Sequence, residues 1–189
     1  MKVRRPLKIT SRISSITNSF VQSIVPHIPA TDGEVREALA ILGMTPEAKT
    51  CVYCGAVATD WDHLRPLVSK QRPTGYVDDV RNRVPSCNRC NQSKSGSDWR
   101  KWMFGNAVGS PKRRGIPDLE ERGRRLEEFE KWGAVQPLPV EELIDAVNWK
   151  AHWQNHDSIA DKMRESQKLA EQMKAAIHKA YDPPKADHP

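Results

Sequence analysis

Apolar residues recur at spacings of three and four along several stretches of this chain, a period typical of helices that bury one face. The first stretch runs over 13–25 and ends at Pro26, which cannot continue a helix. A second helix is expected after Thr31, because Glu34 follows three positions later as in a capping box, and Gly43 is a suitable end. We expect both helices to pack beside the central part of the chain.

The C-terminal half is also predicted to be helical. A strongly charged helix is expected over 118–132, followed after two prolines by a long helical pattern over 140–180. The polar run 151–157 is the place where this long helix could divide. Its later part carries a narrow apolar seam that includes Ile159 and Ile177. Such a seam can pack on its own domain, on a second copy in a homodimer, or on a partner protein.

The centre of the chain lacks this helical period and reads as short strands and turns. A strand and turn are expected over 60–68, a loop over 69–76 and a second strand over 80–84. A helix is then expected from 86 to 94, and Gly96 should end it. This order predicts an α+β fold with a small strand pair in a mostly α-helical domain.

Composition and charge narrow the class of protein. The chain has 189 residues, of which 38% are hydrophobic and 29% charged, so one domain with a modest core and a helical extension is expected. The net charge of +6 favours a polyanionic partner, with nucleic acid as the first candidate. Apolar runs fall short of the roughly 20 residues that span a membrane, and a secretory signal is not visible. We therefore expect a cytoplasmic protein without a membrane partner.

The first 31 residues contain no acidic side chain. An Arg- and Ser-containing segment without acids can resemble an organelle transit peptide. The interpretation that we prefer is a basic arm or helix that touches phosphates. Its basic residues are Lys2, Arg4, Arg5, Lys8 and Arg12.

All four cysteines stand in two Cys-x-x-Cys knuckles, at 51–54 and 87–90. In a chain that is not secreted, paired cysteines favour a metal over disulfides. Four thiolates suit a tetrahedral structural Zn²⁺ without an open position for chemistry. The gap of 32 residues between the knuckles exceeds the roughly 15–20 of a simple zinc ribbon and leaves room for a hairpin with a working loop. The expected zinc ligands are Cys51, Cys54, Cys87 and Cys90.

Polar residues with catalytic potential lie between and beside the knuckles. Asp62 and His63 fall in the insert, and Asn91 follows the last cysteine directly. Carboxylate and amide oxygens are hard ligands that suit Mg²⁺ or Mn²⁺. A neutral histidine beside such a cation could accept a proton from water.

The order of these residues resembles the HNH endonucleases, whose core is the ββα-metal fold. The resemblance covers about 51–99 and rests on the two knuckles, on Asp62-His63 with Pro66, on Asn82, and on Asn91 with Lys94. Asn91 stands at the last motif position, where His is the other variant, and an amide oxygen there makes a catalytic Zn²⁺ or Ni²⁺ less suitable.

The resemblance implies a role for each motif residue. His63 would be the general base that activates water, and Asn82 would orient the loop that carries it. Asp62 and Asn91 would hold one catalytic Mg²⁺ or Mn²⁺ at the scissile phosphate. The expected products are a 5′-phosphate and a 3′-hydroxyl.

Basic residues crowd the insert near this proposed centre. Several like charges close together need an anion, and DNA phosphate is the economical explanation. Lys94 is a further candidate, because it lies three positions after Asn91 on the same helix face. The predicted DNA-binding residues are Arg65, Arg72, Arg81, Arg83 and Lys94.

Together these observations predict a metal-dependent HNH endonuclease that acts on DNA, of a restriction or phage-defence type and encoded by bacteria or their viruses. Two alternatives are a nicking enzyme of a phage or mobile element, and a non-catalytic zinc-knuckle subunit that binds nucleic acid within a larger complex. The expected divisions are an N-terminal arm with helices at 1–47, the nuclease core at 48–104, a helical region at 105–181 and a polar tail at 182–189.

Overall fold

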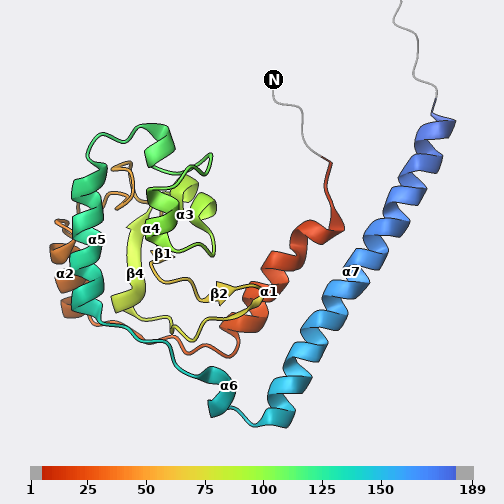
Figure 1. The fold of residues 1–189 in the computed structure, drawn as a ribbon, viewed down its shortest axis with the longest axis horizontal. Coiled ribbons are helices and arrows are strands. Elements are labelled where there is room, and N and C mark those ends of the chain that lie inside the picture. The colour runs from red at the N-terminus through yellow and green to blue at the C-terminus, as the bar shows by residue number, and fades with distance from the viewer. Residues whose placement is uncertain (1–5, 182–189) are drawn as a thin grey trace, which may run out of the picture. The chain divides into compact units, whose positions relative to one another are not determined.

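A computed structural model describes residues 6–181 of the chain (Figure 1). Part of the expected basic arm, including Arg4 and Arg5, and the expected polar tail lie outside the described residues. The chain forms two compact units. One unit comprises Val21–Leu143, and the described part of the other comprises 6–20 and 144–181.

The larger unit is built on a pair of antiparallel strands, β1 (Asp60–His63) and β4 (Arg83–Ser86). In their register His63 lies opposite Arg83. The second strand begins later than the pattern at 80–84 predicts, because Val80–Asn82 forms a 3₁₀ turn, η2, with the Asp79 carboxylate bonded to the amide of Arg81. This turn aims the Asn82 side chain back at the chain that follows β1.

Two further strands of two residues each, β2 (Val68–Ser69) and β3 (Arg72–Pro73), form a hairpin where a loop was expected. The turn between them places Lys70 and Gln71 at positive φ, 48° and 62°, as a two-residue hairpin of this hand requires. The prediction failed here because neither residue is the Gly or Asn that usually marks such a turn.

Two short helices follow the second knuckle. Helix α3 (Asn88–Lys94) begins in the knuckle and ends two residues before Gly96, as expected, with Ser95 at φ 48°. Helix α4 (Trp99–Met103) buries Trp99 and Trp102. Within 60–94 the larger unit thus has the β1–β4 pair followed by helix α3, with the β2–β3 hairpin and η2 between the two paired strands.

Helices α2 (Asp32–Ile41) and α5 (Leu119–Gly133) pack on each other and close the core of this unit (Figure 1). The capping box predicted at Thr31 and Glu34 is present. The core that they cover includes the rings of Tyr53 and Trp102, which meet edge to face with their centroids 5.1 Å apart. Because α2 and α5 complete this core, the compact unit extends beyond the expected range of 48–104 on both sides.

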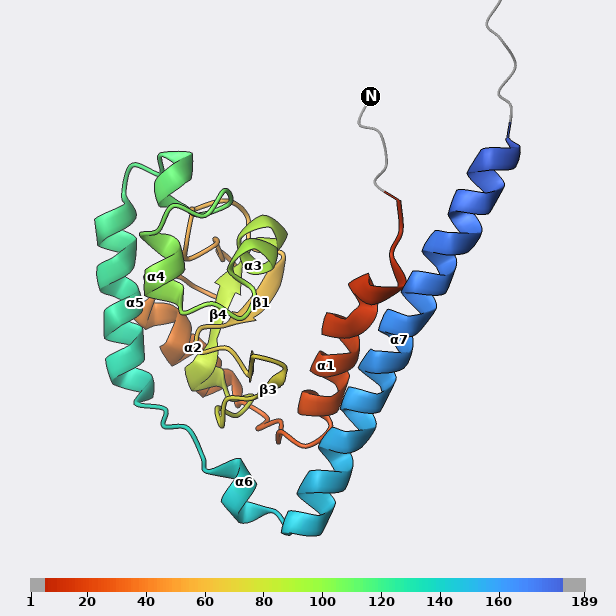
Figure 2. The ribbon, with the colours of Figure 1, turned by 45° about the vertical axis from the view of Figure 1, so that its right-hand side comes forward.

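The other unit is a helical pair. Helix α1 (Ile13–Gln22), preceded by the 3₁₀ turn η1 (Ile9–Arg12), lies alongside α7 (Ala146–Ala180) (Figure 2). Their contact is partly polar, since Thr17 Oγ1 lies 2.9 Å from Nε2 of the buried His156. The N-terminal helix therefore packs on α7 within this unit.

The long C-terminal helix divides at a different point from the one expected. Helix α6 (Val140–Leu143) ends early, and α7 starts after Asp145, whose carboxylate accepts the amides of Val147 and Asn148. The polar run 151–157 is continuous helix, because part of it packs on α1. Within the described chain, no helix is long and apolar enough to cross a membrane.

Candidate active site and metal centre

The four cysteines converge at one end of the β1–β4 pair, as expected. Their Sγ atoms all lie within 4.8 Å of one another, and the Cys54–Cys87 pair is 3.7 Å apart. Four sulfurs about 2.3 Å from one Zn²⁺ would lie about 3.8 Å from each other. The cluster therefore fits a structural metal such as zinc, held by four protein ligands.

Neighbouring groups favour the thiolate form of Cys51, whereas burial and the other cysteines raise the pKa values of Cys87 and Cys90. A hydrogen bond from the Cys90 thiol lowers the pKa of Cys51 to about 4. Arg114, from the short 3₁₀ turn η3 (Lys112–Arg114), places Nη1 3.1 Å from the sulfur of Cys90. A cationic donor outside the ligand set stabilises the negative charge of the bound thiolates.

Strand β1 sends Asp62 and His63 to opposite sides, because successive side chains of a strand alternate. Asp62 is only 6% exposed and faces the core, whereas His63 is partly exposed. The two residues of the dipeptide therefore have different surroundings.

The carboxylate of Asp62 is bound inside the protein. Its Oδ2 lies 3.1 Å from Nζ of Lys94 and accepts the Tyr53 hydroxyl at 2.8 Å. Lys94 is fully buried and also donates to the carbonyl of His63 at 2.8 Å. Burial raises the pKa of Asp62 and lowers that of Lys94, while their mutual attraction opposes both shifts.

This ion pair corrects the expectation for Lys94 and bears on the one for Asp62. Lys94 cannot contact DNA phosphate, because its ammonium is enclosed and bonded to protein oxygens. The Asp62 carboxylate, expected to hold a divalent cation with Asn91, is bonded here to the ammonium of Lys94 and the hydroxyl of Tyr53. Asn91 lies half-buried on α3.

His63 has a carboxylate partner that the sequence did not indicate. Its Nε2 lies 2.7 Å from Oδ1 of Asp78. Arg83 binds both oxygens of this carboxylate, and Nδ1 of His27 lies 2.9 Å from Oδ2. Burial alone would raise the pKa of Asp78, but the hydrogen bonds from Arg83, His63 and His27 outweigh it and hold that pKa well below its usual range.

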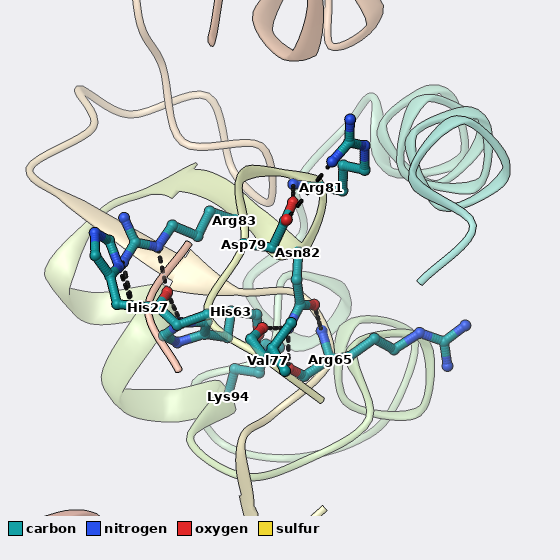
Figure 3. Close-up of polar contacts among 10 residues, drawn as sticks. His27, His63, Arg65, Val77, Asp79, Arg81, Asn82, Arg83 and Lys94 are labelled. Atoms are coloured by element: carbon teal, nitrogen blue, oxygen red, sulfur yellow. Dashed lines mark hydrogen bonds and ion pairs between the residues drawn. The ribbon is translucent and has the colours of Figure 1, made fainter. Parts of the chain in front are cut away.

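The backbone fixes this arrangement. The amide of Asp78 donates to the carbonyl of Pro26 at 3.2 Å, and the amide of Ile28 donates to the carbonyl of Asp78 at 2.9 Å. These bonds make a parallel bridge between His27 and Asp78. Figure 3 shows His27, Arg83 and His63 close together.

Asn82 holds the chain that follows His63. Its side chain accepts the amide of Arg65 at 2.8 Å and donates to the carbonyl of the same residue at 2.9 Å (Figure 3). Its own carbonyl accepts the amide of Leu64 at 2.8 Å. These are side-chain to backbone bonds of the kind that the resemblance implies, and Asn82 is buried where it makes them.

The arginines of the insert bind to groups of the protein itself. Arg65 pairs with Glu130 at 2.9 Å, Arg81 with Glu34 at 3.3 Å, and Arg83 with Asp78. Arg72 donates to the carbonyl of Gln71 at 3.0 Å. Crowding of like charge in the sequence therefore does not require DNA phosphate, because carboxylates from α2, α5 and the loop before η2 pair with Arg81, Arg65 and Arg83.

Two residues of the site were missed by sequence reasoning, Asp78 and His27. Asp78 stands in an acidic pair without any motif spacing, and His27 lies 51 positions before it. The weak signal was the position of His27 between two prolines, which marks a fixed extended segment.

Comparisons with known proteins gave no match: no family model, no curated protein and no solved structure resembles this chain closely enough to be reported. The resemblance to HNH nucleases therefore rests on the motif residues alone. The function is therefore inferred from the geometry around His63 and the four cysteines.

Proposed function

We propose that this chain is a zinc-stabilised endonuclease of the HNH type that hydrolyses DNA phosphodiester bonds with His63 as the general base. The observation that carries the proposal is the 2.7 Å bond between His63 Nε2 and Asp78 Oδ1. A carboxylate that holds one ring nitrogen orients the imidazole and stabilises its protonated form, which leaves Nδ1 to take a proton from water. The motif order around His63 supplies the reaction class.

In the proposed reaction, His63 Nδ1 accepts a proton from water while the water oxygen forms a bond to phosphorus. The bond between phosphorus and the 3′ oxygen breaks and the 3′ oxygen takes up a proton, from solvent or from an acid of the site, which gives a 5′-phosphate and a 3′-hydroxyl. Asp78 is a positioning residue, because it acts through the ring of His63. A general base of this kind contributes about 10²–10⁴-fold to the rate.

Zinc would hold the site together rather than take part in the reaction. Four thiolates complete a tetrahedral shell and leave no position for water or phosphate. They tie the start of the insert to α3, and Asn82 then fixes the turn after His63. A net charge of +6 suits the approach of DNA, although carboxylates of the protein already pair with Arg65 and Arg81 in this arrangement.

The test is cleavage of supercoiled plasmid DNA by the full chain, in buffer that contains Mg²⁺ or Mn²⁺. The parent protein should convert the plasmid to nicked or linear forms with ligatable 5′-phosphate ends. His63→Gln should slow this conversion about a hundredfold or more. His178→Gln changes an exposed histidine of α7 and serves as the matched control, which should cleave as the parent does.

Undiminished cleavage by His63→Gln would overturn the proposed mechanism. DNA binding by the parent without any cleavage would favour the non-catalytic zinc-knuckle protein instead. Mapping the ends on a random-sequence DNA library would then separate nicking from double-strand cleavage.

A further inference from the structure

We propose that His27 is a second catalytic residue of this site, the general acid that protonates the leaving 3′ oxygen. The inference rests on the proposed function of His63 and adds a group that the motif does not contain.

The two histidines are bound to the two oxygens of one carboxylate. His63 Nε2 lies 2.7 Å from Oδ1 of Asp78, and His27 Nδ1 lies 2.9 Å from Oδ2. Each ring therefore keeps one nitrogen outside the Asp78 contact, Nδ1 in His63 and Nε2 in His27. Phosphodiester hydrolysis needs one group that accepts a proton from water and another that delivers one to the leaving oxygen. A pair of rings held on one carboxylate meets this need.

The position of His27 is fixed by more than its side chain. Backbone bonds on either side of it, from Asp78 to Pro26 and from Ile28 to Asp78, place the segment beside the site. The His27 ring is 58% exposed, so a substrate can reach it, and His63 is partly exposed as well.

Arg83 adds a fixed positive charge between the two rings. Its guanidinium binds both oxygens of Asp78, and its Nη2 lies 3.0 Å from Nδ1 of His27, which is a contact of two donors when Nδ1 gives its proton to Asp78. Cationic groups near a transferring phosphoryl group stabilise the charge that develops on its oxygens. The cluster therefore combines a proton acceptor, a proton donor and a cation around one carboxylate.

The proton balance of the reaction is complete with these groups. Water loses a proton to His63 Nδ1 as its oxygen bonds to phosphorus. The phosphorus–O3′ bond breaks, and O3′ takes a proton from His27 Nε2. The products are the 5′-phosphate and the 3′-hydroxyl, with His63 protonated and His27 neutral. Exchange with solvent returns both rings to their starting forms, since both are accessible.

The test compares two substrates that differ in the leaving group. Plasmid DNA needs protonation of its leaving alkoxide, whereas the p-nitrophenyl ester of thymidine 5′-monophosphate releases a nitrophenolate that leaves without it. His27→Gln should slow plasmid cleavage about a hundredfold or more and change hydrolysis of the ester less than about threefold. His63→Gln should slow both reactions, because both need activated water.

Equal losses of His27→Gln on the two substrates would show a structural role and overturn the inference, as would full activity on plasmid. A second variant, His27→Ala, should regain plasmid cleavage when imidazole is added, and no regain would also count against an acid at this position. The proposed function would fail separately if His63→Gln retained parental activity on both substrates, whatever the effect of the His27 variants.

Discussion

The ammonium of Lys94 lies 3.1 Å from the carboxylate of Asp62, and both side chains are buried in the unit that carries the cysteine cluster. Tyr53 and the carbonyl of His63 complete the hydrogen bonding of the pair. A buried ion pair of this kind contributes little over a well-packed apolar pair, but the loss of one partner leaves an uncompensated charge. This asymmetry makes the pair easy to test.

Lys94→Met should lower the free energy of unfolding by about 3–5 kcal/mol, because it leaves the Asp62 carboxylate buried and unpaired. Urea denaturation followed by circular dichroism measures the change. The matched control is Lys101→Met, which removes an exposed lysine and should cost less than about 0.5 kcal/mol. Adding Asp62→Asn to Lys94→Met should recover part of the loss, and a loss no larger than that of the control would contradict the buried pair.

Asp62→Asn also tests whether this residue binds a divalent cation. If the role of Asp62 is to pair with Lys94, the variant should be less stable than the parent. The Mg²⁺ concentration that gives half-maximal plasmid cleavage should then stay within about twofold of that of the parent. Removal of a charged ligand from a cation site would instead raise that concentration by about tenfold or more. A Mg²⁺ titration of cleavage distinguishes the two results.

Asp78→Asn should weaken the dependence of stability on acid pH. The folded-state pKa of Asp78 is lowered, so its contribution is present above the unfolded value of about 3.9 and is lost as pH falls through the folded value. The variant should be less stable than the parent near neutral pH and should lose less stability between about pH 5 and pH 2. Thermal melting across this range provides the measurement.

The control for that series is Asp161→Asn, which removes an exposed carboxylate paired with Arg164. It should follow the parent curve, since exposed ion pairs contribute little. Parallel curves for Asp78→Asn and the parent would mean that Asp78 does not carry the stabilisation assigned to it.

Asn82→Ala should cost about 1–3 kcal/mol of stability, because the amide and carbonyl of Arg65 both lose a partner in a buried turn. It should also reduce plasmid cleavage, since the turn follows His63. Asn82→Asp keeps the acceptor for the Arg65 amide but loses the donor to its carbonyl, and its loss of stability should come from that donor and from the buried charge. Unfolding and cleavage measured on both variants separate the turn from the chemistry.

Cys87→Ser should abolish stoichiometric zinc binding. The parent is expected to hold one zinc per chain, measured by atomic absorption, and the variant should bind far less and melt at a lower temperature. Asn88→Ala, at the exposed neighbouring position, should keep both the zinc and the melting temperature. A Cys87→Ser protein that melts like the parent without zinc would rule out a structural role for the metal.

Regular spacing explains what sequence reasoning found. The knuckles, the capping box at Thr31 and the end of α3 near Gly96 follow from residue types whose local geometry is narrow. The pattern of polar and apolar positions predicted Lys94 wrongly, because a charged residue on a helix is normally assigned to the solvent-exposed face. Its burial depends on Asp62, which lies 32 positions earlier, and no local pattern records that partnership.

Long-range ionic pairing explains what was missed. Asp78 and His27 meet through backbone bonds between segments 51 positions apart, and neither lies at a motif position. The same holds for the arginines of the insert, whose carboxylate partners come from helices outside it. The net charge of a sequence does not distinguish an arginine that pairs with a glutamate of the protein from one that binds a phosphate.

The pairing of Arg65 with Glu130 and of Arg81 with Glu34 bears on how this protein could be trimmed or grafted. A fragment limited to 48–104 would retain the cysteines and His63 but would lose both glutamates and His27. Arg65 would then lose its carboxylate partner and Arg81 would keep only Asp79, and non-specific binding to nucleic acid would be the expected result. The segments on either side of the knuckles therefore set the selectivity of any minimal version, which should begin before Pro26 and end after Gly133.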